Sequence, residues 1–203
     1  GYKCYYFGNG DDGAMKTNKT TVEIDGDKFN FYFEKSGGNK GAGKTGDKDD
    51  KFYQSGKLLR AGSDEKYQVV EKLTQATLDD TGKAGSGTIE GYNKLDYVKE
   101  FLEAITPANY SEGVTEANVK FLKGLGVNKD ASDLSELYII NYDRKDAAGK
   151  READAISASD YFLVNTSCKV IDTNSKNKDG NDYYYVVQKN GKTGKIVAVY
   201  VED

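Results

Sequence analysis

One short pattern recurs along the chain and constrains its fold more than any other feature of the sequence. An aromatic triplet at residues 5–7 is followed by a turn rich in Gly, Asn and Asp, and then by GAMKT at residues 13–17. The same order appears with a triplet at residues 31–33 and GAGKT at residues 41–45. Aromatic residues favour strands, and Gly or Asn adopts the positive φ of a tight turn, so each copy predicts a small β-hairpin. Because one hairpin cannot bury its aromatic face alone, we expect the copies to stack on one another.

Looser copies of the pattern occur later in the chain. Residues 51–59 have the sequence KFYQSGKLL, and YFL at residues 161–163 precedes SCKV at residues 167–170. A Tyr triplet at residues 183–185 leads to NGKTG at residues 190–194. Hairpins are therefore expected toward both ends of the chain.

The second copy contains GNKGAGKT at residues 38–45, which matches the G-x-x-x-x-G-K-[ST] pattern of a phosphate-binding loop. In such a loop a helix begins at the Lys-Ser/Thr pair, so that backbone N–H groups surround the phosphates. Here Thr45 is followed by GDKDDKFYQSGK, which has an immediate Gly, three Asp and no apolar helical stripe. We therefore interpret the match as a by-product of the hairpin repeat and predict that ATP and GTP do not bind.

Composition argues against several kinds of partner and chemistry. The 203 residues include 29 basic and 33 acidic side chains, for a net charge of -4, so no basic field is present to hold a nucleic-acid backbone. No apolar run approaches the length needed to span a membrane. The chain has no His, which excludes His-based catalytic triads and imidazole metal ligands. We expect no nucleic-acid partner and no membrane insertion.

Acidic clusters next to Gly residues raise the question of a cation site. They occur at residues 11–12, 25–27 and 179–182, and none has the D-x-[DN]-x-[DN]-G spacing with a terminal Glu that a calcium loop requires. Asp and Asn before Gly are typical of hairpin turns. No two carboxylates are singled out as a pair for glycoside hydrolysis. The sequence therefore predicts no metal site, no cofactor and no catalytic residue.

The two cysteines, Cys4 and Cys168, lie far apart in the sequence. They have neither the clustered spacing of a zinc site nor a His partner for nucleophilic catalysis. Two readings stay open: unpaired thiols, or a disulfide that joins the two ends of the chain.

The middle of the chain has a different pattern, which favours helices. Residues 93–105 place four aliphatic side chains on one helical face, between a capping Asn93 and Pro107. A second helix is expected after a capping Thr115, ending at Gly124 or Gly126.

The middle region contains three further segments with apolar residues. Residues 131–137 are expected to form a short third helix, whereas residues 65–78 fit either a helix or a return strand. Residues 137–143 are expected to be a strand or a buried helix end followed by a turn.

The chain resembles the cell-wall-binding repeats of Gram-positive surface proteins, a group that includes choline-binding, glucan-binding and clostridial-toxin repeats. The resemblance rests on YKCYYFGNGDDGAMKT (residues 2–17) and VEIDGDKFNFYF (residues 22–33). It extends more loosely to DKFYQSGKLL (residues 50–59), DYFLVNTSCKV (residues 160–170) and KDGNDYYYVVQKNGKTGK (residues 178–195). The middle of the chain has no counterpart in these repeats.

In that family the hairpins stack into a solenoid, and sugars or choline lodge against aromatic faces. The resemblance implies a secreted module at the cell surface that binds cell-wall polysaccharide or peptidoglycan. The chain departs from the family in having no Trp, and Cys4 stands where a Trp is usual, so choline binding is not expected. The candidate ligand-binding residues are Tyr5, Tyr6, Phe7, Phe31, Tyr32, Phe33, Phe52, Tyr53, Tyr183, Tyr184 and Tyr185.

Together these features predict an α+β fold, with solenoid-like β-hairpin repeats at both ends of the chain and a mostly helical insert. The repeats are expected over residues 1–62 and 160–203, and the insert over residues 63–159. The expected function is that of a noncatalytic cell-surface module that binds a glycan. Two alternatives stay open: an adhesion domain that binds a surface protein with the repeats as scaffold, and a nucleotide-binding enzyme.

Overall fold

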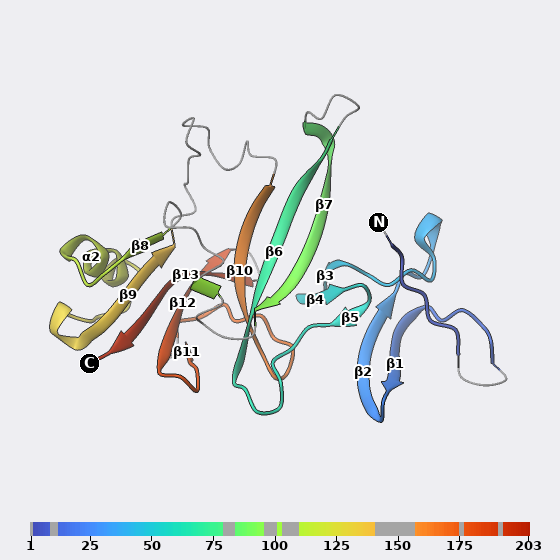
Figure 1. The fold of residues 1–203 in the computed structure, drawn as a ribbon, viewed down its shortest axis with the longest axis horizontal. Coiled ribbons are helices and arrows are strands. Elements are labelled where there is room, and N and C mark those ends of the chain that lie inside the picture. Colours follow the sequence, from blue (N-terminus) through green and yellow to red (C-terminus); the bar gives the residue numbers. More distant parts are fainter. Residues whose placement is uncertain are drawn as a thin grey trace.

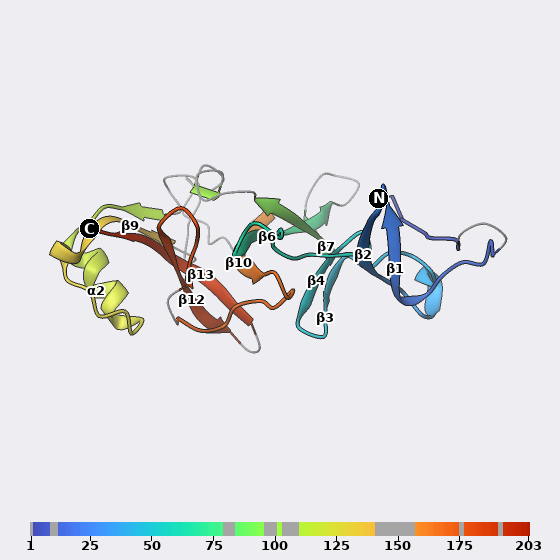
Figure 2. The same ribbon diagram turned by 90° about the horizontal axis from the view of Figure 1, so that it is seen from below.

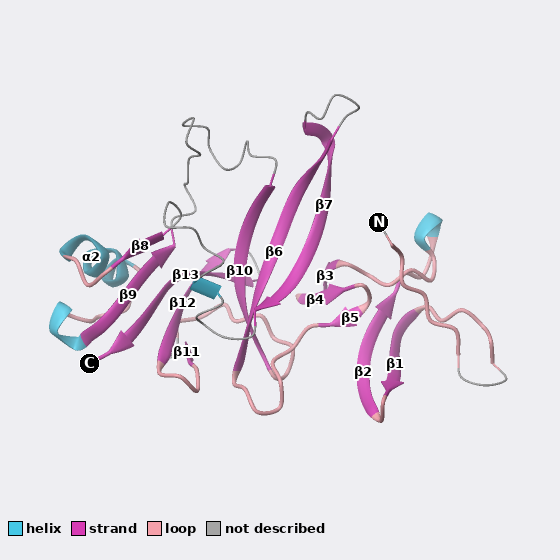
Figure 3. Cartoon of the chain, viewed as in Figure 1, coloured by secondary structure: helices cyan, strands magenta, loops and turns pink. Residues whose placement is uncertain are grey.

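The computed structural model describes residues 2–8, 12–78, 84–95, 101–102, 110–140, 157–174, 177–190 and 193–203. Most of these residues lie in β-strands, which form three antiparallel sheets (Figure 3). The sheets follow one another along the long axis of the molecule, with helix α2 at the end opposite to the N-terminal sheet (Figures 1 and 2).

The N-terminal sheet has the strand order β1-β2-β5-β4-β3. Strands β1 and β2 form a hairpin whose two-residue turn, Asp25 and Gly26, has positive φ at both positions. This geometry matches the right-handed twist of the flanking strands. A short 3-10 helix, η1 (Gly37–Asn39), lies between β2 and β3. The strands are β1 (Asn18–Ile24), β2 (Asp27–Phe33), β3 (Gly46–Lys48), β4 (Lys51–Gln54) and β5 (Lys57–Leu58).

The middle sheet has three strands in the order β10-β6-β7, and side chains on both of its faces are buried along residues 161–164. Along β10, Tyr161 and Leu163 pack toward the C-terminal sheet, whereas Phe162 and Val164 pack toward the N-terminal sheet. Side chains alternate between the two faces of a strand, so four consecutive apolar residues are needed where both faces are buried. The strands are β6 (Tyr67–Leu78), β7 (Ala84–Leu95) and β10 (Ser157–Asn165).

The C-terminal sheet has the order β11-β12-β13-β9-β8, and α2 packs on the face turned away from the middle sheet. The long hairpin β12–β13 forms its centre, and a register shift in this hairpin brings Val197 and Ala198 into the same core. Its elements are β8 (Tyr110–Glu112), α2 (Glu116–Gly124), the 3-10 helix η3 (Ala131–Asp133), β9 (Leu134–Ile140), β11 (Asn177–Lys178), β12 (Tyr183–Asn190) and β13 (Thr193–Glu202).

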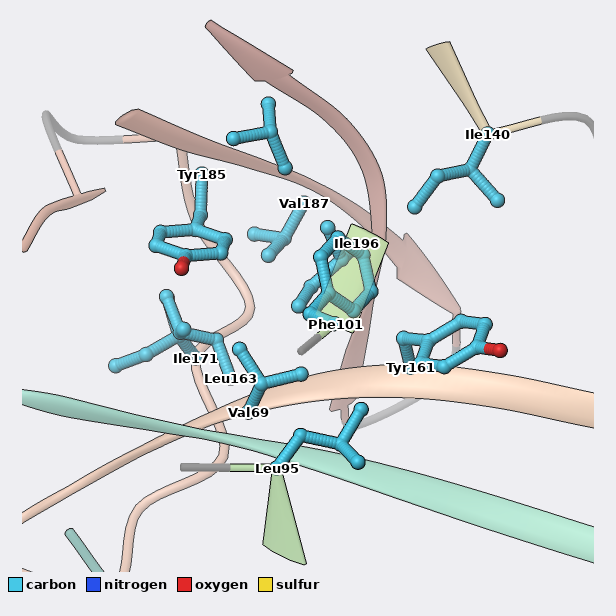
Figure 4. Packing of buried hydrophobic residues seen from close by; sticks show 11 residues of the cluster. Val69, Leu95, Phe101, Ile140, Tyr161, Leu163, Ile171, Tyr185, Val187 and Ile196 are labelled. Carbon is cyan, nitrogen blue, oxygen red and sulfur yellow. The ribbon is translucent and has the colours of Figure 1, made fainter. Parts of the chain in front are cut away.

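Three hydrophobic clusters hold these layers together. One fills the space between the middle and C-terminal sheets, where Figure 4 shows the side chains of Leu163, Ile196 and Phe101 close to one another. A second joins α2 to the C-terminal sheet, and a third joins the middle sheet to the N-terminal sheet. The core is therefore distributed over the interfaces between layers, and burial of this apolar area is the main stabilising term.

The expected α+β fold with a mostly helical insert is wrong. Among the described residues of the 63–159 region, β6, β7, β8, β9 and the start of β10 are strands, and α2 is the only α-helix with described bounds. Residues 101–102 are also helical. Strands from this region pair with strands from the C-terminal region in both the middle and the C-terminal sheet, so the two regions are interleaved.

Two of the expected helices are corrected by particular pairings. Residues 93–95 continue β7, where they pair with residues 69–71 of β6, so no helix begins at Asn93. The rest of that pattern, apart from helical residues 101–102, lies outside the described residues, as does Pro107. Long-range pairing here overrides the local helical pattern.

The expected third helix at residues 131–137 is a single 3-10 turn followed by β9. Leu134 and Leu137, which are three residues apart, nevertheless lie in the same core. The two side chains share a face of β9 because the pairing with β13 has a register shift that leaves Ser135 as an extra residue. Residues three positions apart in the sequence therefore point to the same side of the strand. A β-bulge thus imitates a helical pattern.

Other local predictions are confirmed. The Thr115 side chain caps α2 by accepting from the Asn118 backbone N–H at 3.2 Å, and Val119 and Leu122 are buried on one face. Residues 65–78, left open between helix and strand, contain β6. Residues 137–140 belong to β9, and the remainder of the segment to residue 143 lies outside the described residues.

The hairpin repeat is confirmed locally in every copy, but the solenoid is wrong. Residues 5–17 (the first copy) and 31–45 (the second copy) both make hairpin pairings, and so do β4 with β5, β12 with β13, and Val164 with Val170. In a solenoid each unit would contact only its neighbours. Here β10 and β13 extend beyond their hairpins and pair with β6 and β9, which distributes the copies over three sheets.

Candidate functional site

The structure disperses the aromatic residues that the sequence singled out as ligand-binding faces. They lie in the N-terminal sheet, in the C-terminal sheet and in the segment before β1, and they do not converge on one surface. Tyr5 and Phe7 are exposed, with 40% and 55% of their surface accessible. The half-buried members of the set are Tyr6, Phe31, Tyr183 and Tyr184. The buried members are Tyr32, Phe33, Phe52, Tyr53 and Tyr185.

Several of these rings serve to pack one layer on another. Phe52 lies 4.9 Å from the ring centre of Tyr92 and 4.8 Å from that of Phe162, between the N-terminal and middle sheets. Within the C-terminal sheet, Tyr184 stacks at 4.9 Å on Tyr200, its partner in the β12–β13 pairing. Aromatic pairs at these distances stabilise a core beyond their area burial. The ring faces in these contacts are covered by other side chains of the protein.

One predicted residue, Tyr185, does line a cavity. A space of about 370 Å³ lies between the middle and C-terminal sheets, and we term it the Tyr185 pocket. Its apolar wall is formed by Val69 of β6, Leu95 at the end of β7 and Leu163 of β10, all of which are labelled with Tyr185 in Figure 4. Its polar wall is formed by Asp64, Glu65, Lys66, Tyr67, Asp179, Gly180 and Asn181.

Asp179 holds the polar wall in place. Its carboxylate accepts hydrogen bonds from the backbone N–H groups of Asn181 at 2.8 Å and Tyr183 at 3.1 Å. It also accepts from the Tyr185 hydroxyl at 3.2 Å. The first two bonds fold the turn before β12, in which Asp182 has positive φ, and such local bonding is why Asp is favoured in turns.

The Tyr185 hydroxyl is a fixed donor in this arrangement. Burial, followed by the charge of Asp179, raises the pKa of Tyr185 above its ordinary value. The phenol therefore stays protonated at physiological pH and donates a hydrogen bond to Asp179. The Asp179–Tyr185 bond links the turn to β12 and orients the neighbouring Asn181.

The pocket combines an apolar wall with several hydrogen-bonding groups. Asp64, Glu65 and Asp179 supply carboxylate oxygens, the Asn181 side chain supplies an amide, and Lys66 is the one cation among the lining residues. A few polar groups placed around an apolar surface are typical of sites for small molecules. The arrangement suits a compact ligand that carries both hydroxyl and C–H groups.

Sequence reasoning missed most of this pocket. Asp64 and Glu65 come from the loop before β6, and nothing in the local sequence relates them to the turn at residues 179–182. The acidic cluster of that turn predicts a hairpin turn, which its hydrogen bonds confirm. Its proximity to β6 depends on the pairing of β6 with β10, which no short motif announces.

The phosphate-loop match at residues 38–45 has no following helix. Lys44 and Thr45 precede strand β3, and Lys44 Nζ lies 3.5 Å from Glu34 Oε1. The glycines have a packing role: a Cβ on Gly43 would stand 2.6 Å from the Ser55 carbonyl oxygen, and one on Gly41 would overlap the Met15 side chain. Close packing explains these glycines without a nucleotide.

Other features bear on metal, redox and membrane chemistry. Cys4 and Cys168 are free thiols, the first exposed and the second buried, so the disulfide reading is wrong. Burial raises the pKa of the Cys168 thiol. Over the described ranges, no group of three or more Cys, Asp or Glu side chains is placed to hold a metal ion. Within the same ranges no helix is both long and apolar enough to cross a membrane.

Comparisons of the chain with protein-family models, with curated proteins and with solved structures found no match. The resemblance to cell-wall-binding repeats thus rests on the sequence motifs alone. A functional inference has to be built from the geometry of the site.

Proposed function

We propose that the chain is a noncatalytic module that binds a glycan, and that the Tyr185 pocket is its binding site. The observation that supports this most directly is the composition of the pocket wall: apolar Val69, Leu95 and Leu163 line a cavity of about 370 Å³ together with carboxylate and amide groups. A sugar ring has the same two characters, with C–H groups on its faces and hydroxyls at its edge. Carboxylates and amides are suited to bonding such hydroxyls.

The sequence motifs also suggest where in or outside the cell the protein acts. Their resemblance to repeats of Gram-positive surface proteins supports a secreted module at the cell surface, with cell-wall polysaccharide or peptidoglycan as the ligand. The pocket differs from the aromatic faces of those repeats, because its polar groups come from the loop before β6 and the turn before β12. The proposal therefore shifts the ligand site from the hairpin faces to the space between two sheets.

Binding of the purified chain to a panel of neutral oligosaccharides and to isolated cell walls tests the proposal. Asn181→Ala removes the pocket amide but keeps the backbone N–H that bonds Asp179, and Glu65→Gln removes a charge at the rim. Loss of one ligand hydrogen bond should weaken binding about tenfold. Asn128→Ala, at an exposed position outside the pocket, is the matched control and should bind as the parent does.

Three results would decide against the proposal. Glycan binding that is unchanged in both pocket variants would place the site elsewhere. Cell-wall retention that is lost in Phe7→Ser but kept in Asn181→Ala would place the ligand site on the exposed face of the first hairpin, where Phe7 lies, and not in the Tyr185 pocket. Conversion of a bound oligosaccharide to shorter products, detected by mass spectrometry, would show an enzyme.

A further inference from the structure

A second cavity lies at the opposite end of the loop that contributes to the Tyr185 pocket. It has a volume of about 220 Å³ and is bounded by the start of β2, by β5 and residues 59–62 after it, and by the end of β7. Four cations line it, Lys28, Lys57, Arg60 and Lys94, and we term it the basic cleft. None of its described lining residues is Asp or Glu.

The lining of the basic cleft carries positive charge only, although Glu23 lies opposite Lys28 in the β1–β2 pairing. The chain as a whole has a net charge of -4, and lysines elsewhere, such as Lys72 and Lys129, form ion pairs. Within the described part of the molecule, by contrast, none of the four cleft cations forms an ion pair with a carboxylate. Glu65 lies near Gly62 at one margin of the cleft. Four like charges around one cavity attract an anion because its binding relieves their repulsion.

Lys57 is the most constrained of these cations. Its ammonium nitrogen lies 3.9 Å from the ring centre of Phe29, a cation–π contact that orients the side chain over the cleft. Partial burial, followed by the charges of Lys94 and Arg60, lowers the pKa of Lys57. The charges of Lys94 and Arg60 lower this pKa because like charges close to one another disfavour the protonated form of Lys57.

The backbone of β2 adds a donor. Strand β2 pairs with β5 only at Phe31 and Lys57, so β5 ends before it reaches the first residues of β2. Tyr32 and Glu34 direct their N–H groups to the side of β2 away from β1, where they bond Gly56 and Ala42. Strand residues alternate in this respect, so the Lys28 N–H points to the same side, into the space beyond β5.

We propose that the basic cleft binds a phosphate group of a small phosphate-bearing ligand. Lys57 and Lys94 supply point charges, and the Arg60 guanidinium can form paired hydrogen bonds with phosphate oxygens. A dianionic phosphate matches four surrounding cations better than a single carboxylate does. The volume of about 220 Å³ accommodates one or two phosphate groups rather than an extended polymer. This inference does not depend on glycan binding at the Tyr185 pocket.

Titration of the full chain with inorganic phosphate and with pyrophosphate tests the proposal, by calorimetry and by NMR shifts of the Lys57 and Arg60 side chains. We expect saturable binding of at least one probe, weakened about tenfold in Lys57→Met and in Arg60→Gln. Binding should also weaken as sodium chloride is raised, because salt screens exposed charges. Lys120→Met, which removes an exposed lysine from α2, is the matched control and should bind as the parent does.

The outcomes are distinguishable from one another. Binding of pyrophosphate or phosphate that is lost in the cleft variants and kept in Lys120→Met supports the proposal. Absence of saturable binding of both probes up to about 10 mM overturns it. So does equal weakening in Lys120→Met, which would indicate a general charge effect. Urea unfolding of each variant confirms that a loss of binding is not a loss of fold.

Discussion

The first copy of the hairpin repeat (residues 5–17) and the second copy (residues 31–45) make the same backbone hydrogen bonds in different surroundings. In the first copy Lys16 N–H donates to the Tyr6 carbonyl at 2.8 Å, and in the second Lys44 N–H donates to the Tyr32 carbonyl at 3.0 Å. Yet Phe7 is 55% exposed, whereas its counterpart Phe33 is 1% exposed. The motif determines the local hairpin, whereas the surroundings of each hairpin determine which of its side chains are buried.

The difference arises from what flanks each hairpin. The second copy has β1 on one side and the first copy on the other, where Gly43 N–H donates to the Cys4 carbonyl at 2.7 Å. The Tyr6 ring also stacks over Phe33 at 6.2 Å. The first copy lies at the margin of the molecule (Figure 1). Equivalent substitutions in the two copies therefore measure burial separately from hairpin geometry.

The largest difference is expected for the aromatic pair. Phe33→Ala removes a buried ring and should lower the free energy of unfolding by about 3–5 kcal/mol, as large-to-small changes in a core do. Phe7→Ala removes an exposed ring and should change it by less than about 1 kcal/mol. Urea unfolding followed by Tyr fluorescence measures both. Equal effects would show that the two hairpins are equally buried in solution, contrary to the structure.

A smaller difference is expected for the glycine that opens each GAxKT segment. Gly41 has a φ of 80°, and a Cβ there would overlap the Met15 sulfur, whereas a Cβ on Gly13 would meet nothing within 4 Å. Gly41→Ala should destabilise by about 1–3 kcal/mol, because it strains the backbone and displaces Met15. Gly13→Ala should be neutral or slightly stabilising.

The double variant Gly41→Ala with Met15→Ala separates the two causes. Removing the Met15 side chain relieves the overlap but leaves the backbone strain, so part of the lost stability should return. Chemical unfolding of the single and double variants, with Met15→Ala alone as reference, measures this coupling. A strictly additive result would assign the whole cost to the backbone of Gly41.

The two copies also show how far the sequence could predict the fold. Hairpins and the capped helix α2 were found because their signals are local: turn residues at fixed offsets and a Thr115 side chain that bonds the Asn118 N–H. The sheets were not, because β6 with β10 and β9 with β13 join segments far apart in the sequence. The bulge at Ser135 made the local pattern misleading, since it places residues three positions apart on one face of a strand, as a helix would.

The two cavities depend on the same long-range pairings. Tyr185 was among the residues that the sequence selected, yet Asp64 and Glu65 complete its pocket only because β6 lies beside β10. The basic cleft assembles Lys28 and Lys94 from strands that belong to different sheets. No spacing within one segment could indicate either set, so sites of this kind become visible only once the layers are in place.

The smallest difference concerns the lysine of each GAxKT segment, which pairs with a carboxylate in both copies. In the second copy Lys44 and Glu34 are half-buried and 3.5 Å apart, so Lys44→Met should cost less than about 1 kcal/mol and the cost should shrink as salt is added. In the first copy Lys16 pairs with the exposed Asp12. There the expected readout is a titration, because the hydrogen bond and charge of Lys16 lower the pKa of Asp12 from its ordinary value of 3.8.

The sign of the pH dependence follows from that direction. Since the pKa of Asp12 is lower in the folded protein than in the unfolded chain, the Lys16–Asp12 pair contributes to stability above pH 3.8. The contribution is lost as the pH falls through the lowered pKa of the folded state. In Lys16→Met the pKa of Asp12, followed by carboxyl carbon NMR, should rise toward its ordinary value. An unchanged titration would show that the pair is not formed in solution, and that the first hairpin lacks an ion pair which the second one keeps.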